Sequence, residues 1–131
     1  MIRAKQILGS LALTAMALAY VFVAVPAAEA HHSGAGFGTD VIEVTGVVKE
    51  FQFTNPHSWL QLNVKGDDGK TVEWSIEWGS PNQLGRSGVR PSTFPPGAKA
   101  TVKIRPMTNG SPVAAFVGAK MEDGTVVGRW E

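Results

Sequence analysis

Short runs in which apolar and polar residues alternate recur along the chain after residue 40, with a Gly- and Pro-rich interruption at residues 79–97. The clearest run places Leu60, Leu62 and Val64 on one side and Trp59 and Gln61 on the other. Successive side chains of a strand point to opposite faces, so this period predicts half-buried strands. The chain has 131 residues and no Cys, which predicts one domain held by a packed core without disulfides.

Gly, Pro, Asn and Asp separate five predicted strands and a short terminal one. The strands cover residues 40–53, 57–65, 72–78, 100–106 and 113–121, with the terminal strand at 125–127. A shift of the alternation at Gly46–Val47 predicts a β-bulge in the first strand. Ser80 as a cap and Pro81 as the first helical residue predict a short helix after the third strand. This order predicts an all-β domain over 41–131, a small five-stranded OB-like barrel with one short helix; a small β-sandwich is the alternative.

The first thirty residues are typical of a cleaved secretory signal peptide. Arg3 and Lys5 precede an uncharged apolar run, and Ala28-Glu29-Ala30 forms a small-x-small cleavage site. The apolar run is nearly as long as a spanning helix, so a retained anchor is the rival interpretation. No basic cluster follows the run, which favours cleavage after Ala30 and a periplasmic or secreted protein without a stable membrane anchor.

Removal of residues 1–30 leaves a mature chain with balanced charge. Arg3, Lys5 and Glu29 leave, so ten basic residues face ten acidic ones. This balance gives no electrostatic reason to expect a nucleic acid or an anionic membrane as partner. The new N-terminal stretch, residues 31–40, is rich in Gly and predicts a flexible arm unless Phe37 or a ligand pins it.

Several segments resemble a family of small exported bacterial proteins classed as a domain of unknown function. They are HHSGAGF at the mature start, TGVVKEFQFTNPHSWLQLNV, VEWSIEWGSPNQLGRSGV and PPGAKATVKIRPMTNGSPVA. The resemblance covers essentially the whole mature chain, and NPHSW is its most specific motif. It implies an exported single domain and carries no activity.

All three histidines fall where they could share a metal ion. His31 becomes the first mature residue, so its α-amine and ring nitrogen can chelate one ion, and His57 adds a third nitrogen in the arrangement called a histidine brace. His32 offers an alternative or auxiliary ligand. Planar nitrogen sets suit Cu(II), and deprotonated ligands are needed, so binding should weaken below about pH 6. Zn(II) with Glu73 or Glu77 as an added ligand is a further option without motif support.

The histidines also have a purely structural interpretation. His31 and His32 can be solvated residues near a cleavage site, and His57 can serve only the turn after Asn55-Pro56. The residues leave the metal and structural interpretations about equally weighted. The metal interpretation leads to a copper-handling or delivery protein rather than an enzyme.

A second candidate is the polar face of the second and third strands, with Trp59, Gln61, Glu73 and Glu77. OB folds bind ligands on these strands, and a Trp beside polar groups can stack on a sugar or planar molecule. This face defines the alternative function, a metal-free periplasmic ligand- or protein-interaction module. Packing of Trp59 beneath the arm or the Pro-rich loop is the competing structural explanation, whereas Trp74 and Trp78 are predicted core residues.

Common enzyme motifs do not occur in the sequence. Glu73 and Glu77 would lie about 13 Å apart along a strand, beyond the roughly 5–9.5 Å of glycosidase carboxylate pairs. There is no nucleophile elbow, phosphate-binding loop or HExxH motif. Arg86, Arg90 and Arg105 are interpreted as ordinary surface charge.

Overall fold

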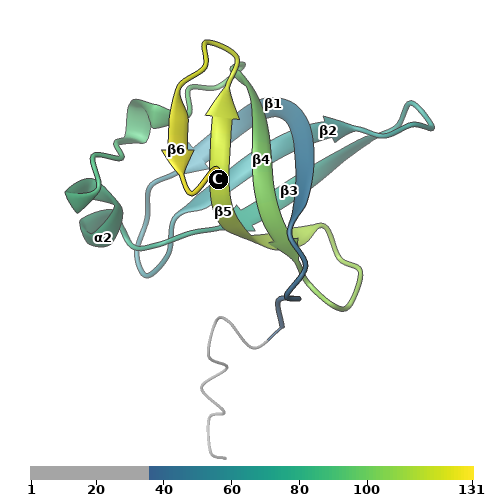
Figure 1. Cartoon of the computed structure of the whole chain (residues 1–131), viewed down its shortest axis with the longest axis horizontal. Helices are drawn as coiled ribbons and strands as arrows, with labels where there is room; N and C mark the ends of the chain where they lie inside the picture. Colours follow the sequence, from purple (N-terminus) through teal and green to yellow (C-terminus); the bar gives the residue numbers. More distant parts are fainter. Residues whose placement is uncertain (1–35) are drawn as a thin grey trace, which may run out of the picture. The chain divides into compact units, whose positions relative to one another are not determined.

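The protein forms a closed five-stranded β-barrel with a short sixth strand at its edge (Figure 1). The structure is a computed structural model and describes residues 36–131. The strands are β1 (Ile42–Gln52), β2 (Trp59–Lys65), β3 (Thr71–Glu77), β4 (Lys99–Pro106), β5 (Val113–Met121) and β6 (Val126–Gly128). Between β3 and β4 lie the helix α2 (Pro81–Arg86) and the 3-10 turn η2 (Pro91–Thr93). The OB-like barrel with one short helix is thereby confirmed.

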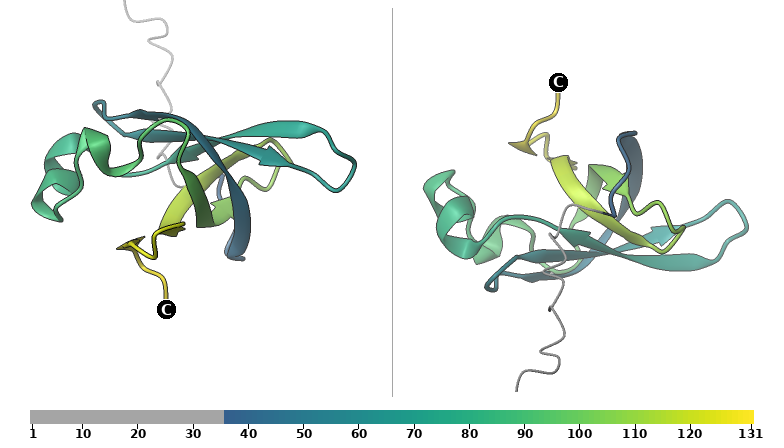
Figure 2. Two further views of the ribbon diagram at one scale, coloured as in Figure 1. Left: turned by 90° about the horizontal axis from the view of Figure 1, so that it is seen from above. Right: turned by 90° about the horizontal axis from the view of Figure 1, so that it is seen from below.

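Barrel closure depends on a short parallel pairing between β3 and β5. The sheet order is β3-β2-β1-β4-β5-β6, and β3 also pairs with β5 through Ser75–Val113, Ile76–Ala114 and Glu77–Ala115. Figure 2 shows the layer of β2 and β3 crossing over β4 and β5, as expected when a twisted sheet curls onto itself. This seam brings together residues from both halves of the sequence.

The core lies on the inner face of the strands and under the connection from β3 to β4. Strand residues supply most of it, and the α2–η2 connection adds Leu84, Val89 and Phe94 at one end. Trp74 and Trp78 pack against this core, as predicted, while Trp59 is not part of it. Val72 shares the inner side of β3 but is 42% exposed, because the β2–β3 hairpin projects beyond the barrel (Figure 1).

The long first strand bends as predicted, but the bulge lies later than predicted. The register between β1 and β2 shifts between Val48 and Glu50, not at Gly46–Val47. Gly46 has a different function: a Cβ there would lie 2.3 Å from the Asn63 carbonyl oxygen. The glycine therefore permits close approach of β1 to β2, and the extra residue that turns the strand follows it.

The predicted helix forms at the predicted residues. The Ser80 hydroxyl accepts a hydrogen bond from the backbone N–H of Gln83 at 3.3 Å, and Pro81 begins the helix. Buried Leu84 attaches this single turn to the core. No helix within residues 36–131 is long and apolar enough to cross a membrane.

Candidate functional site

His57 lies in the turn that joins β1 to β2. The Asn55–Pro56 peptide bond in this turn is cis, and the Thr54 hydroxyl donates to the His57 carbonyl at 3.0 Å. The next residue, Ser58, exchanges backbone hydrogen bonds of 2.9 Å with Gly79 and Trp78. These bonds fix His57 beside the C-terminal end of β3.

His57 forms a charge-assisted pair with Glu77. Its Nδ1 lies 2.8 Å from Glu77 Oε1, and the side chains are 36% and 12% exposed, respectively. An ionised carboxylate only accepts hydrogen bonds, so Nδ1 carries the proton and donates it. In the neutral ring this assigns the lone pair to Nε2, the nitrogen that can bind a metal or accept a hydrogen bond.

The pairing of strands places a continuous row of side chains across the outer surface. Gln52 lies opposite Trp59, Trp59 opposite Glu77, Glu77 opposite Ala115, and Ala115 opposite Arg105. Neighbouring strands are about 4.8 Å apart, so the backbones at Glu77 and Arg105 are separated by roughly 10 Å. The small Ala115 side chain between them leaves a hollow.

That hollow is part of an open depression of about 250 Å³, here called the His57 depression. Its polar lining residues are His57, Glu77, Gln83 and Arg105, and Phe37, Trp78, Gly79, Ala115 and Phe116 complete it. Trp78 and Phe116 stack with ring centroids 4.0 Å apart and join the buried Phe94. The depression therefore rests on a packed aromatic cluster.

Residues 36–38, within the predicted arm, pair with the end of β4. The Gly38 N–H donates to the Pro106 carbonyl at 2.8 Å, and the Thr108 N–H donates to the Gly36 carbonyl at 3.0 Å, around a bridge between Phe37 and Met107. This pairing holds the Phe37 side chain at the depression. His31 and His32, the other predicted metal ligands, lie outside the described residues.

The predicted ligand face on β2 and β3 exists as a shared outer surface. Trp59 lies opposite Glu77, Gln61 opposite Ser75, and Asn63 opposite Glu73. The Ser75 hydroxyl donates to Gln61 Oε1 at 2.6 Å, and Gln61 donates to Gln52 at 3.4 Å. Glu73 is bound to Lys49 at 2.7 Å, so it belongs to a different part of this face from Glu77.

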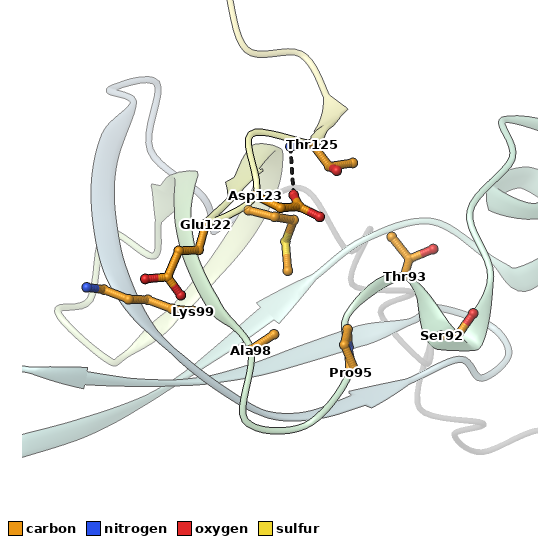
Figure 3. Close-up of a pocket in the computed structure, with 9 residues that line it drawn as sticks. Ser92, Thr93, Pro95, Ala98, Lys99, Glu122, Asp123 and Thr125 are labelled. Carbon is orange, nitrogen blue, oxygen red and sulfur yellow. Dashed lines mark hydrogen bonds between the residues drawn. The ribbon is translucent and has the colours of Figure 1, made fainter.

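A larger depression of about 540 Å³ lies between the loop after η2 and the β5–β6 turn (Figure 3). Asp123, one of its two acidic residues, accepts a hydrogen bond of 2.9 Å from the Thr125 backbone N–H. This bond and a second one to the Thr125 side chain lower the pKa of Asp123 below its ordinary value. Asp123 is therefore already used in stabilising the turn, and the remaining cation and anion, Lys99 and Glu122, lie on the rim (Figure 3).

Residues 36–131 hold no group of three or more His, Cys, Asp and Glu side chains placed to bind a metal. His57 and Glu77, both singled out in the sequence, do come together. Sequence reasoning missed Arg105, which was interpreted as ordinary surface charge. Its approach to Glu77 depends on the β3–β5 seam, for which the local pattern carries no signal.

Comparison with known proteins identifies a family but no relative of known activity. A family model described as a family of unknown function (DUF6152) matches residues 19–115. This range includes every predicted site residue and Arg105. No curated protein and no solved structure matches the chain.

Proposed function

The chain belongs to DUF6152, a family of unknown function, and we propose from its own residues that it is an exported copper-binding protein. Residues 1–30 are a signal peptide removed during export to the periplasm or the medium. His31 then supplies its α-amine and ring nitrogen to Cu(II), His57 supplies Nε2, and His32 is an auxiliary ligand. The function is copper handling or delivery rather than catalysis.

The observation that carries the proposal is the hydrogen bond between His57 Nδ1 and Glu77 Oε1. Metal-binding histidines commonly donate their second ring N–H to a carboxylate, which fixes the ring and makes the ligating nitrogen more basic. His57 has this partner, and Glu77 is only 12% exposed, so water competes little for the bond.

A second observation supports the proposal: Gly36 and Phe37 pair with the end of β4, so only a short segment of chain connects His31 to this fixed point. Phe37 and His57 line the same depression. Four residues separate His31 from Gly36, and the five residue-to-residue steps span at most about 17 Å. The covalent connection therefore permits the mature N-terminus to reach His57.

The test is a Cu(II) titration of protein that begins at His31, followed by calorimetry and electron paramagnetic resonance. We expect nitrogen hyperfine structure and an affinity that falls at least tenfold when one Gly precedes His31. His57→Ala should cause a similar loss, whereas Trp59→Ala should not change the affinity. Binding that is indifferent to both the added Gly and His57→Ala would refute the proposal. Mass spectrometry of the exported protein tests cleavage after Ala30.

A second candidate function is a metal-free interaction module centred on Trp59. The observation that favours it is the outer face where half-buried Trp59, outside the core cluster, lies beside the Gln52–Gln61–Ser75 hydrogen bonds. An aromatic ring beside amide and hydroxyl groups suits stacking on a sugar or a planar ligand, or contact with a periplasmic protein. Trp59→Ala would abolish this binding, and an extra residue before His31 would leave it intact.

A further inference from the structure

Arg105 stands out in the His57 depression because its positive charge has no ionic partner among residues 36–131. Three ion pairs occur within residues 36–131, and none includes Arg105. The nearest acidic side chain in the row is Glu77, which lies two strands away and already accepts a hydrogen bond from His57. The guanidinium is thus available to an anion from solution.

The shape of the depression limits which anion fits. Ala115, directly between Glu77 and Arg105, contributes only a methyl group, and the whole depression has about 250 Å³. This volume is below the 300–1,000 Å³ typical of sites for drug-sized ligands, so a smaller molecule is expected. Phe37 and Trp78 add aromatic surface to the lining, which suits a flat apolar body.

The charges of the lining residues further limit which ligand can bind. Arg105 presents a planar fork that matches the two oxygens of a carboxylate. Glu77, on the other side of Ala115, would repel a second negative charge at the far end of the ligand. Dianions such as phosphate are disfavoured for the same reason, so one negative charge is the best match.

From this arrangement we propose that the His57 depression binds a small aromatic monocarboxylate, with its carboxylate on Arg105 and its ring over Ala115 against Phe37. The Gln83 amide and the His57 ring complete the polar lining. This inference uses only described residues and does not require copper. It goes beyond the proposed metal-binding function and can fail or succeed separately from it.

The test is a titration of metal-free, ¹⁵N-labelled protein beginning at His31 with benzoate, in the presence of a chelator. A ligand of this size supports a dissociation constant of roughly 1 mM. We expect saturable shifts of the Ala115 amide and the Arg105 side-chain N–H. Acetate, which lacks the ring, and phosphate, a dianion, should each bind at least threefold more weakly than benzoate.

Matched variants separate this site from general attraction of anions. Arg105→Gln should weaken benzoate binding at least tenfold, and Ala115→Leu should do the same by filling the hollow while Arg105 remains. Arg129→Gln removes a cation from the C-terminal region outside the depression and should leave binding unchanged. Because Arg105 is exposed, its replacement should preserve the fold, as the dispersion of the amide spectrum will verify. The inference is overturned if Arg105→Gln binds benzoate like the unaltered protein, or if Arg129→Gln loses as much affinity.

Discussion

Glu73 and Glu77 lie four residues apart on the same outer face of β3, and each bonds a basic side chain at nearly the same distance. The Lys49–Glu73 pair measures 2.7 Å with exposures of 52% and 43%, whereas the His57–Glu77 pair measures 2.8 Å with exposures of 36% and 12%. Exposed ion pairs contribute little because water and salt screen them. The two pairs therefore have nearly equal lengths, and the carboxylates differ in how much water reaches them.

The largest expected difference between Glu77 and Glu73 is in copper affinity, measured after each carboxylate is neutralised in turn. Under the copper proposal, Glu77→Gln should weaken Cu(II) binding by about 10- to 100-fold, because loss of a carboxylate partner makes a ligating imidazole less basic and less well oriented. Glu73→Gln should change the affinity less than twofold. Competition titration against a copper chelator measures both, and equal effects would contradict the distinction.

The free energy of unfolding should also differ between variants of Glu77 and Glu73, but less than the copper affinity does. Glu77→Ala removes the acceptor of the His57 N–H and should cost about 1 kcal/mol of unfolding free energy, the contribution of a typical hydrogen bond. Glu73→Ala removes a solvated pair and should cost less than about 0.5 kcal/mol. Urea unfolding followed by Trp fluorescence provides both values. If Glu73→Ala lost more unfolding free energy than Glu77→Ala, the conclusion that Glu77 makes the more shielded bond would be wrong.

The smallest effect is expected at Asp123, a fully exposed carboxylate whose partner lies in its own turn. Hydrogen bonds from Thr125 lower the pKa of Asp123 in the folded protein. A lowered folded-state pKa stabilises the protein above the unfolded-state value of about 3.9, and this contribution disappears as pH falls through the folded-state pKa. Asp123→Ala should therefore lower the melting temperature slightly at pH 6 and progressively less below about pH 4. A difference that grows on acidification would disprove this assignment.

Local patterns were sufficient to predict most of the fold. Alternation identified β2 and β3, and Ser80-Pro81 identified the helix, because strand faces and helix caps depend on neighbouring residues. The position of the bulge was missed because Gly46 marks a close approach of two strands rather than the inserted residue. A glycine in a strand indicates either an irregular backbone or a close contact, and the sequence alone does not distinguish the two.

The candidate site was only half predictable for a related reason. His57 and Glu77 were both recognised from residue type and strand face, but their hydrogen bond was not. Arg105 was dismissed as surface charge, and the pairing of Phe37 with Met107 joins residues seventy positions apart. Contacts of this kind arise from the order in which strands close the barrel, which no short stretch of sequence encodes.

The seam between β3 and β5 has a thermodynamic consequence for anything that occupies the depression. It consists of three residue pairs; Glu77 and Ala115 form the last pair, and Arg105 lies opposite Ala115 on the neighbouring strand β4. A ligand that contacts both β3 and β4 can bind only when the barrel is closed. Its binding free energy therefore stabilises the closed barrel. At ten times its dissociation constant, such a ligand would add about 1.4 kcal/mol. Opening of the seam and release of the ligand would then be one coupled event.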